Sequence, residues 1–358
     1  MKKVALIPIV YGVLLAGLAS FSVLDTLVIE KAGRKVDFSN SFNFDFGKSS
    51  SKNNSSSNSQ SSASNSVSKS NDSSNGSSVT SSGYSSSSGS ASSSSSSAIF
   101  SDKVIQTENL YVDQNLRVET NVEIIQTQLL KGEGTRDTRV YSAHIYMNHL
   151  SHLKTALAKD KYGINVTEYT STIARRKGAV FAINGDTYGA QEKGYVLRNG
   201  EILRKSKRKG AEDLAIYADG SFESFLEEDY TLEQIAAKGA YQVFSFGPTL
   251  VKNGQRVVEK GTEVAVFDAK NNNQRVSIGI VEPLHYVIAV CDARLTDSYG
   301  MQLFEMADYM VGMGAQIAYN LDGGGSSSFF FNDELQNKPC TSPNQVTERG
   351  VSDIVYFS

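Results

Sequence analysis

The chain has 358 residues, a formal net charge of −3, two cysteines and no tryptophan. So small a net charge argues against a protein that holds nucleic acid electrostatically. Two cysteines exclude a disulfide-rich scaffold, and the sequence has no Cys-x-x-Cys pair that would suggest a zinc site. The composition divides the chain into three predicted parts, residues 1–30, 31–100 and 101–358.

The first part, residues 1–30, is predicted to be a signal anchor that forms a transmembrane helix. Two lysines precede the uncharged run from Val4 to Leu24, which as a helix would be about 31 Å long and could cross a bilayer. The small residues near its end form only a weak cleavage site, so an uncleaved anchor is favoured over a cleaved secretory signal. Basic residues stand on both sides of the run and leave its orientation open.

The second part, residues 31–100, is dominated by serine. Between Ser49 and Ser97, 30 of 49 residues are Ser, and none is Ile, Leu, Phe or Met. Such a segment cannot bury enough apolar surface to offset the entropy of ordering it, so we expect a disordered linker. We interpret it as an extracytoplasmic stalk that tethers the next part to the cell membrane. A disordered tract without a spacing role is the alternative.

The third part, residues 101–358, is predicted to be one α+β domain, mixed and β-rich. Asn-Gly pairs between apolar runs indicate hairpin turns, and residues 275–281 and 284–291 form a further hairpin pattern. Apolar residues at helical spacing predict one helix near 150–159 and another over 303–311. The Asn-Gly pairs in question begin at Asn184, Asn199 and Asn253.

The most informative segment is Ala318 to Phe331, in which apolar strands flank Asp322, three consecutive glycines and three serines. Three adjacent glycines cost backbone entropy, so something must approach that backbone closely. Open N–H groups in a glycine turn form a concavity that binds anions, and serine hydroxyls add donors. The segment therefore predicts a site for phosphate or a sugar phosphate. A tight turn that merely needs positive φ is the alternative.

These residues resemble the phosphodiester glycosidase family. The resemblance implies a hydrolase that cleaves sugar-1-phosphodiester bonds. We expect no cofactor. Asp186 departs from the family, which more often has glycine there, and so does Ala293. The resemblance extends over residues 120–358 and is carried by Asn320–Ser327 together with Arg275–Gly279, Val290–Arg294, Gly300–Ala307, Glu348–Ser352, Phe181–Asp186 and Phe244–Gly254.

Cleavage at the anomeric carbon expels a phosphate monoester, a good leaving group, so the main requirement is a grip on phosphate. Arginine provides it through a permanently charged planar fork. A carboxylate must then act as nucleophile or as base for water. Catalytic candidates are Asp322, Asp292 and Glu305. Candidates for substrate binding are Arg275, Arg294, Arg349, Asn184, Gly185, Asp186, Asn320, Gly323, Gly324, Gly325, Ser326 and Ser327.

Each candidate also has a structural interpretation. Asp322 could cap the glycine turn, Asp292 could pair with Arg294, and Glu305 could be a solvated helix carboxylate. Arg349 could anchor its loop through an ion pair, and residues 184–186 could serve turn geometry alone.

The domain as a whole could instead be a non-catalytic module that binds anionic, phosphate-bearing polysaccharide. We expect a sugar-phosphate or glycan substrate in cell-surface polymers, a membrane contact through the N-terminal helix, and no nucleic acid.

Other signals in the sequence are weaker. His144, His149 and His152 lie close together but have no carboxylate at matching spacing, so we expect surface histidines rather than a metal site. The basic run Arg204 to Lys209 is expected to be a solvated loop, although contact with an anionic polymer is an alternative. Cys291 is expected to be a buried thiol and Cys340 an exposed one, with a disulfide as the alternative.

Overall fold

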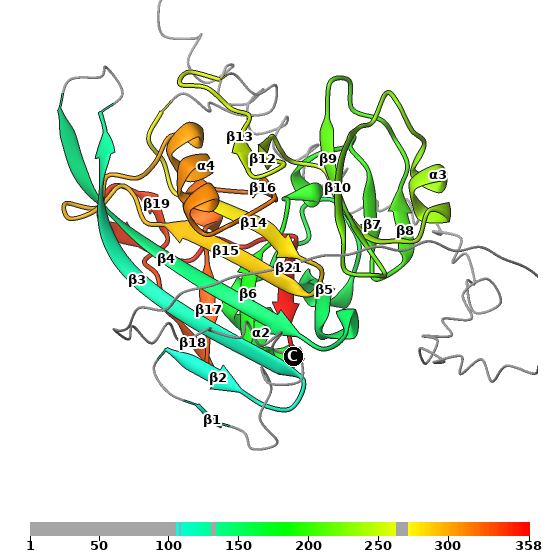
Figure 1. Cartoon of the computed structure of the whole chain (residues 1–358), viewed down its shortest axis with the longest axis horizontal. Helices are drawn as coiled ribbons and strands as arrows, with labels where there is room; N and C mark the ends of the chain where they lie inside the picture. The colour runs from blue at the N-terminus through cyan, green and yellow to red at the C-terminus, as the bar shows by residue number, and fades with distance from the viewer. Residues whose placement is uncertain (1–104, 107–108, 130–133, 263–270) are drawn as a thin grey trace, which may run out of the picture. The chain divides into compact units, whose positions relative to one another are not determined.

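A computed structural model describes residues 105–106, 109–129, 134–262 and 271–358. The strands within these residues form three main sheets with antiparallel pairing, and the largest runs across the centre of the domain (Figure 1). In spatial order, it contains β1 (Ile105–Gln106), β2 (Leu110–Val112), β3 (Leu116–Gln128), β4 (Thr135–Met147), β15 (His285–Cys291), β14 (Arg275–Glu282), β16 (Ile317–Leu321), β12 (Thr249–Lys252) and β13 (Gln255–Arg256).

Two five-stranded sheets accompany it. One contains β10 (Phe222–Leu226), β9 (Glu212–Tyr217), β11 (Ala240–Phe244), β7 (Val196–Arg198) and β8 (Glu201–Arg204). The other contains β18 (Glu334–Leu335), β17 (Phe329–Phe331), β6 (Phe181–Asn184), β21 (Asp353–Phe357) and β5 (Leu153–Leu157), and a small hairpin pairs β19 (Cys340–Ser342) with β20 (Gln345–Val346). The α-helices are α2 (Thr170–Lys177), α3 (Leu232–Ala237) and α4 (Leu303–Gly312), and the short 3-10 turns are η2 (Leu150–His152), η3 (Ala158–Asp160), η4 (Tyr188–Ala190) and η5 (Gly324–Ser326).

The main hydrophobic core lies where the three sheets meet. On β14, Val276, Ile278 and Ile280 alternate with small or polar residues, and all three side chains enter this core. Phe329 and Phe357 enter it from the five-stranded sheet that contains β6, here called the β6 sheet. Phe244 enters it from the five-stranded sheet that contains β9, here called the β9 sheet. Burial of these side chains at a common interface stabilises the domain, because each removes large apolar area from water.

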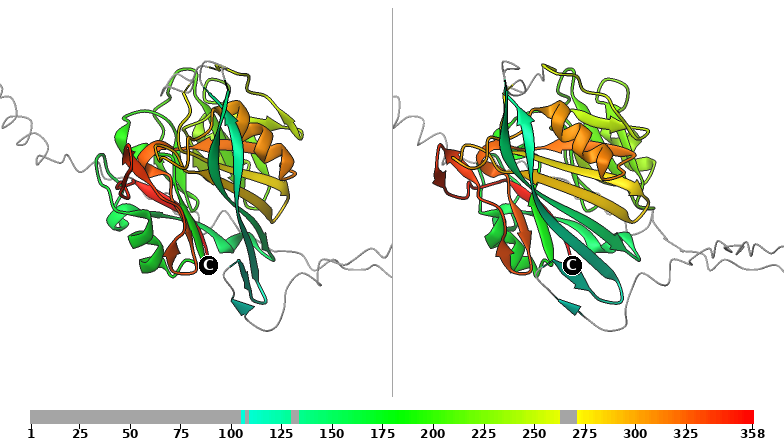
Figure 2. Two further views of the ribbon diagram at one scale, coloured as in Figure 1. Left: turned by 90° about the vertical axis from the view of Figure 1, so that its left-hand side faces the viewer. Right: turned by 60° about the vertical axis from the view of Figure 1, so that its left-hand side comes forward.

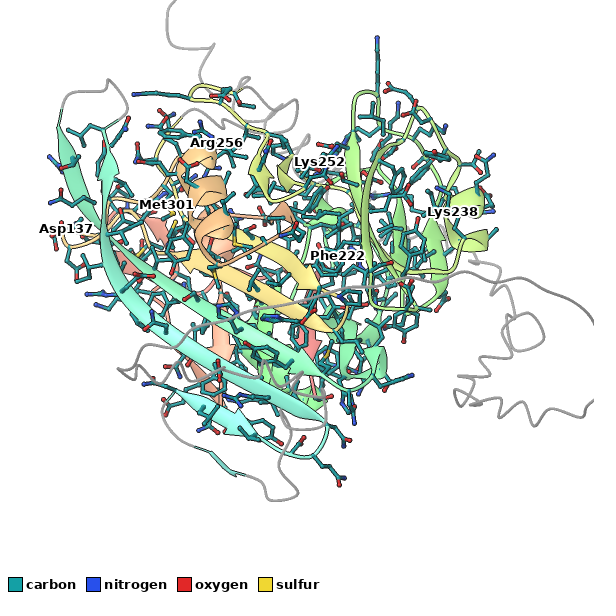
Figure 3. All side chains as sticks on the ribbon, in the orientation of Figure 1. Asp137, Phe222, Lys238, Lys252, Arg256 and Met301 are labelled. Carbon is teal, nitrogen blue, oxygen red and sulfur yellow. The ribbon has the colours of Figure 1, made fainter. Side chains whose placement is uncertain are left out.

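The opposite face of the largest sheet is covered by α4 (Figure 2). Met306, Ala307 and Met310 of this helix lie in one apolar cluster with residues of β12 and β15. Gly279 permits the approach, because a Cβ there would lie 2.9 Å from Met310 and 2.9 Å from the Ile317 carbonyl oxygen. Lys252 of β12, labelled in Figure 3, forms an ion pair with Glu212 of β9 at 2.8 Å, so this contact runs between the largest sheet and the β9 sheet.

The structure confirms most of the predicted elements. The hairpins at Asn199–Gly200 and Asn253–Gly254 are β7–β8 and β12–β13, and the hairpin over 275–291 is β14–β15. The helix over 303–311 is α4, and the β-rich mixed domain is also confirmed.

Two predicted elements are wrong. The segment near 150–159 forms η2, β5 and η3, because β5 pairs with the C-terminal strand β21 and this pairing overrides the helical spacing. Asn184–Gly185 does not close a hairpin, since β6 pairs with β17 and β21 rather than with the next strand.

The anchor and the stalk predicted for residues 1–100 lie outside the described residues and remain predictions. In the part of the chain that the structure does describe, there is no helix with the length and apolarity needed to span a membrane.

Candidate active site

The glycine turn connects β16 to β17 and is packed tightly against the protein itself. A Cβ on Gly323 would lie 2.6 Å from the Gln274 carbonyl oxygen, and one on Gly325 would lie 2.7 Å from Thr341 Oγ1. Gly324 has φ +58°, a conformation that favours glycine. The close approach expected at these glycines is therefore made by neighbouring protein groups.

Several amide groups of this turn are already used inside the protein. Gly324 N–H donates to the Gln274 carbonyl at 3.0 Å, Ser326 N–H to Gly323 at 3.2 Å and Ser327 N–H to Gly324 at 3.1 Å. The expectation of an open row of amides is wrong for these three groups. A grip on phosphate at this turn must therefore rest mainly on nearby side chains.

Arg349 provides the first such side chain. Its Nη2 forms an ion pair with Asp322 Oδ2 at 3.2 Å, while Nε and Nη2 donate to Ser326 Oγ at 2.9 and 2.6 Å. The Arg349 side chain is 45% exposed, whereas that of Asp322 is 12% exposed. A buried carboxyl thus lies directly beside a guanidinium that solutes can reach. Such a guanidinium suits the binding of an anionic substrate.

The ionisation of Asp322 is set by its surroundings. Burial raises the pKa of Asp322, and the Arg349 guanidinium and the Ser326 hydroxyl offset part of that rise. Carboxyl groups with raised pKa values are typical of acid–base catalysts, although structural ion pairs show the same effect.

The loop that carries Arg349 is fixed by its neighbour Glu348. The Glu348 carboxylate accepts hydrogen bonds from Ser171 N at 2.8 Å and Ser171 Oγ at 2.6 Å, in the first turn of α2. Val351 then pairs with Glu168 through a β-bridge. Glu348 is thus held by hydrogen bonds to Ser171, and the ion pair considered for Arg349 is formed with Asp322.

Arg294 reaches the same turn from another strand end. Its Nη1 donates to the carbonyls of Cys340 and Thr341 at 3.1 and 2.7 Å. Its Nη2 lies 3.6 Å from the position that a Cβ on Gly324 would occupy. The structure therefore brings two of the three predicted arginines, Arg294 and Arg349, to the glycine turn.

The third arginine, Arg275, is placed differently. It is 2% exposed, and it donates from Nε to the Met301 carbonyl at 3.1 Å and from Nη2 to the Asn271 carbonyl at 2.8 Å. These contacts favour a role in holding the segments next to β14. Binding of substrate by Arg275 has less support than binding by the other two arginines.

Asp292 lies one side chain away from the turn. Its Oδ1 accepts hydrogen bonds from Asn337 Nδ2 at 3.2 Å and Lys338 N at 3.0 Å, and the same Asn337 amide donates to the Ser327 carbonyl at 2.9 Å. Burial raises the pKa of Asp292. The predicted pair with Arg294 is replaced by these amide contacts, and Asp292 remains the second catalytic candidate.

Glu305 is occupied at the start of α4. One carboxylate oxygen accepts a hydrogen bond from Gln302 N at 2.9 Å, and this contact is part of a capping box. The other oxygen accepts from Gln128 N, at the end of β3, at 2.6 Å. Burial raises its pKa. Both oxygens therefore serve backbone amides, which favours a structural role over a catalytic one.

The segment Asn184 to Asp186 connects the glycine turn to the buried ion pairs that Arg198 forms with Asp186 and Asp353. Asn184 Nδ2 donates to the Asp322 carbonyl at 2.7 Å, and its Oδ1 accepts from Ser328 N at 3.1 Å. Asn320, at the end of β16, donates to the Gly247 carbonyl at 2.9 Å. The polar groups predicted on either side of the turn thus position its backbone.

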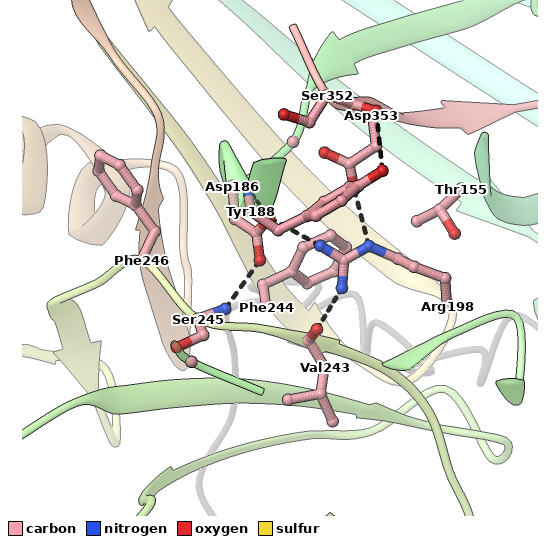
Figure 4. Close-up of polar contacts among 12 residues, drawn as sticks. Thr155, Asp186, Tyr188, Arg198, Val243, Phe244, Ser245, Phe246, Ser352 and Asp353 are labelled. Atoms are coloured by element: carbon pink, nitrogen blue, oxygen red, sulfur yellow. Dashed lines mark hydrogen bonds and ion pairs between the residues drawn. The ribbon is translucent and has the colours of Figure 1, made fainter. Parts of the chain in front are cut away.

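Arg198 and Asp353 were missed by the sequence analysis. Arg198 forms ion pairs with Asp186 Oδ1 at 2.8 Å and with Asp353 Oδ2 at 2.7 Å (Figure 4). The carboxylate at Asp186, the position where the family more often has glycine, thus has a buried partner. The available signal was a charged residue next to an apolar run at each position. Arg198 ends one short strand, and Asp353 begins another.

The remaining sequence signals have structural explanations. Both cysteines are free and buried, which excludes the disulfide and corrects the expected exposure of Cys340. In the basic run, Lys205, Lys207 and Lys209 are exposed as expected. Arg204 differs, because it donates to backbone carbonyls of Tyr188, Gly194 and Lys193. Across the described residues, no group of three or more His, Cys, Asp or Glu side chains is arranged to hold a metal ion.

Comparisons with known proteins agree with this picture. A family model described as phosphodiester glycosidase matches residues 177–358. The SPbeta prophage-derived uncharacterized protein YomE of Bacillus subtilis (strain 168) is 26% identical over 202 residues, a match that covers 55% of this chain and 30% of that protein. The chain therefore spans less than a third of the length of this curated relative.

Two solved structures have a similar fold. The zebrafish N-acetylglucosamine-1-phosphodiester alpha-N-acetylglucosaminidase catalytic domain, auto-inhibited by its pro-peptide, has a TM-score of 0.56 at 22% identity, over 67% of this chain and 83% of that chain. A hypothetical protein from Synechocystis has a TM-score of 0.50 at 14% identity, over 68% of this chain and 62% of that chain. At these identities, the two likenesses concern the fold alone.

Proposed function

The chain belongs to the phosphodiester glycosidase family, and on that premise we propose that it hydrolyses sugar-1-phosphodiester bonds in cell-surface glycans or glycopolymers. The observation that carries the proposal is the contact between the Asp322 carboxyl and the exposed Arg349 guanidinium at 3.2 Å. It combines, at one turn, a carboxylate for the anomeric carbon and a cation for the phosphate.

The chemistry follows from these two groups. Arg349 and Arg294 would bind the phosphodiester and neutralise the charge that builds up on the departing phosphate monoester. Asp322 would act on the anomeric carbon as nucleophile or as the base that activates water. Because Arg349 also contacts Asp322, the incoming phosphate would compete for the guanidinium and change the charge environment of the carboxyl.

The proposed setting is the outer face of the cell membrane. It rests on the uncharged run from Val4 to Leu24, on the serine-rich tract that follows, and on the chemistry of surface polymers, many of which contain phosphodiester-linked sugars. The partners are then a phosphate-bearing glycan as substrate and the membrane as anchor, without nucleic acid.

The test is hydrolysis of synthetic sugar-1-phosphodiesters that differ in sugar and in aglycone, by the purified full chain. Hydrolysis in ¹⁸O-labelled water identifies the broken bond. Label in the released sugar means cleavage between carbon and oxygen, as proposed, and label in the phosphate means a phosphodiesterase instead. Replacing Asp322 with Asn should lower turnover by roughly 10²-fold or more, in line with general-base contributions.

A binding module without catalysis is the alternative that the same experiment separates. In that case, the wild type would bind the diesters and release no sugar. Substitution of Arg349 would then weaken binding, while substitution of Asp322 would have no turnover to reduce.

A further inference from the structure

Arg198 is a buried arginine outside the contacts so far assigned to catalysis. Its side chain is 2% exposed, and its guanidinium pairs with Asp186 and Asp353. The guanidinium carbon lies 4.4 Å from the centre of the Phe244 ring, and Nη1 donates to the carbonyl of Val243 (Figure 4). Polar contacts at the edges of the guanidinium and the Phe244 ring against its face thus fix the orientation of this side chain.

From Asp353, a short series of contacts leads to Asp322. The Asp353 carbonyl accepts a hydrogen bond from Gly185 N at 2.9 Å, and a Cβ on Gly185 would lie only 2.1 Å from Asp353 Oδ1. The Gly185 carbonyl in turn accepts from Asp322 N at 3.2 Å. The backbone of Asp322 therefore rests on Gly185, and Gly185 rests against a carboxylate that Arg198 holds.

The side chain of Asn184 makes a second connection within the same segment, because it donates to the Asp322 carbonyl at 2.7 Å. Asp186, on the other side of Gly185, is held at Oδ1 by Arg198 and at Oδ2 by Ser245 N at 2.9 Å. Arg198 thus holds two acidic residues around Gly185. Asp186 follows Gly185 in the chain, and the carbonyl of Asp353 accepts the hydrogen bond from Gly185 N.

We propose that Arg198 is a positioning residue, which places Asp322 for catalysis by holding Asp186 and Asp353 on either side of Gly185. Arginine is required because one planar fork reaches two carboxylates at once, which a lysine ammonium on a flexible stem does not reproduce. Loss of the fork leaves buried charge without a partner, and the segment would relax to solvate it. The turnover part of this proposal rests on the proposed function.

The first test compares Arg198→Lys with a destabilised control. Leu232→Ala removes a fully buried side chain from the apolar cluster beneath α3, to which none of the three ion-pair residues belongs. The two variants are compared under conditions in which their melting temperatures are lowered equally. Arg198→Lys should then have a kcat about 10²-fold lower than that of wild type, the effect expected when a catalytic group is misplaced by about 1 Å. KM should stay within about threefold of wild type, since Arg294 and Arg349 have other supports. A kcat equal to that of Leu232→Ala would overturn the proposal.

The second test does not depend on turnover. Native amide hydrogen exchange at residues 184–186 and at Asp322 should be faster in Arg198→Lys than in Leu232→Ala at matched stability, while peptides of β3 and β4 exchange alike in the two variants. Equal exchange at Asp322 in the two variants would also overturn the proposal. If the wild type cleaves no sugar phosphodiester, the proposed function fails, and exchange alone then decides the role of Arg198. Should Arg198→Lys not fold, Asp353→Asn, which keeps the size of the side chain, takes its place in both tests.

Discussion

The Gln274 carbonyl oxygen and the α-carbon of Gly323 are in such close contact that no side chain fits between them. A Cβ on Gly323 would lie 2.6 Å from that oxygen, which belongs to backbone rather than to a movable side chain. Gln274 directly precedes β14, so the position of the glycine turn is fixed by the central sheet. The first prediction concerns this contact.

We expect Gly323→Ala to shift the turn, since neither backbone can give way cheaply, and to destabilise the protein by about 1–3 kcal/mol, as overpacking does. Turnover should fall as well, because Asp322 is the preceding residue. Gly312→Ala, at the end of α4, is the matched control: a Cβ there meets nothing within 4 Å. The measurements are melting temperature and kcat of both variants. Equal behaviour of the two would contradict the role of the Gln274 contact.

The second prediction concerns Arg349. Replacement by lysine keeps the charge but removes the fork that contacts Asp322 and Ser326, so we expect KM for a sugar phosphodiester to rise by roughly 10-fold or more. Stability should change little, because the side chain is 45% exposed. Arg175→Lys is the control, since that arginine is 50% exposed and pairs with Asp333. A KM that stays at the wild-type value would remove Arg349 from substrate binding.

The third prediction separates the two roles considered for Glu305. Glutamine can fill the same position of a capping box, but it has one acceptor oxygen where Glu305 uses two. We therefore expect Glu305→Gln to keep turnover and to lose about 1 kcal/mol of stability, and Glu305→Ala, which loses both contacts, to lose more. A catalytic carboxylate would instead lose turnover in both variants, with the fold intact in Glu305→Gln. Thermal melts and kcat values of the two proteins therefore decide between them.

The sequence predicted those parts of the site that depend on local patterns. Asp322, the three glycines and Ser326 follow one another in the chain, so their grouping needed no tertiary information. Arg349 was found through the family resemblance, and its contact with Asp322 joins residues 27 positions apart. The hairpin at Asn199–Gly200 was predicted for the same local reason, because its turn chemistry lies within four residues.

What could not be predicted depends on partners that are distant in the chain. Arg198 and Asp353 are 155 positions apart, and no spacing rule connects them. Glu305 was left open between a catalytic and a structural role, because its contact with Gln128 joins residues separated by 177 positions and no sequence pattern reveals it. β5 was predicted as a helix because its leucines have helical spacing, while its pairing with β21 decides its conformation.

The fourth prediction concerns attachment to the membrane. If the run from Val4 to Leu24 anchors the chain and the serine-rich tract is an exposed stalk, mild protease on intact cells should release a soluble domain that begins near Ala98. The measurement is the N-terminal sequence of the released fragment. A domain that stays protected until the cells are lysed would contradict the outward orientation.

The fifth prediction concerns the pH dependence of stability at Asp213. This side chain is fully buried, and its carboxylate lies near the Ser245 hydroxyl and the Glu227 carboxylate. Burial, and next the nearby Glu227 carboxylate, raise the pKa of Asp213 well above its ordinary value. The folded state therefore keeps a proton that the unfolded chain releases near pH 4, so the contribution of Asp213 to stability is complete at low pH and declines as the pH rises toward the folded pKa.

Asp213→Asn removes this proton equilibrium while it preserves the size of the side chain. The free energy of unfolding of the variant minus that of wild type should therefore become more positive as the pH rises from about 4 toward the folded pKa of Asp213, with a limiting slope of about 1.4 kcal/mol per pH unit. Asp160→Asn is the control: Lys177 and Arg176 lower the pKa of that exposed carboxyl, so it is ionised in both states over this range and its difference should be flat. A flat difference for Asp213→Asn as well would mean that Asp213 is ionised in the folded protein, with its charge compensated inside the cluster.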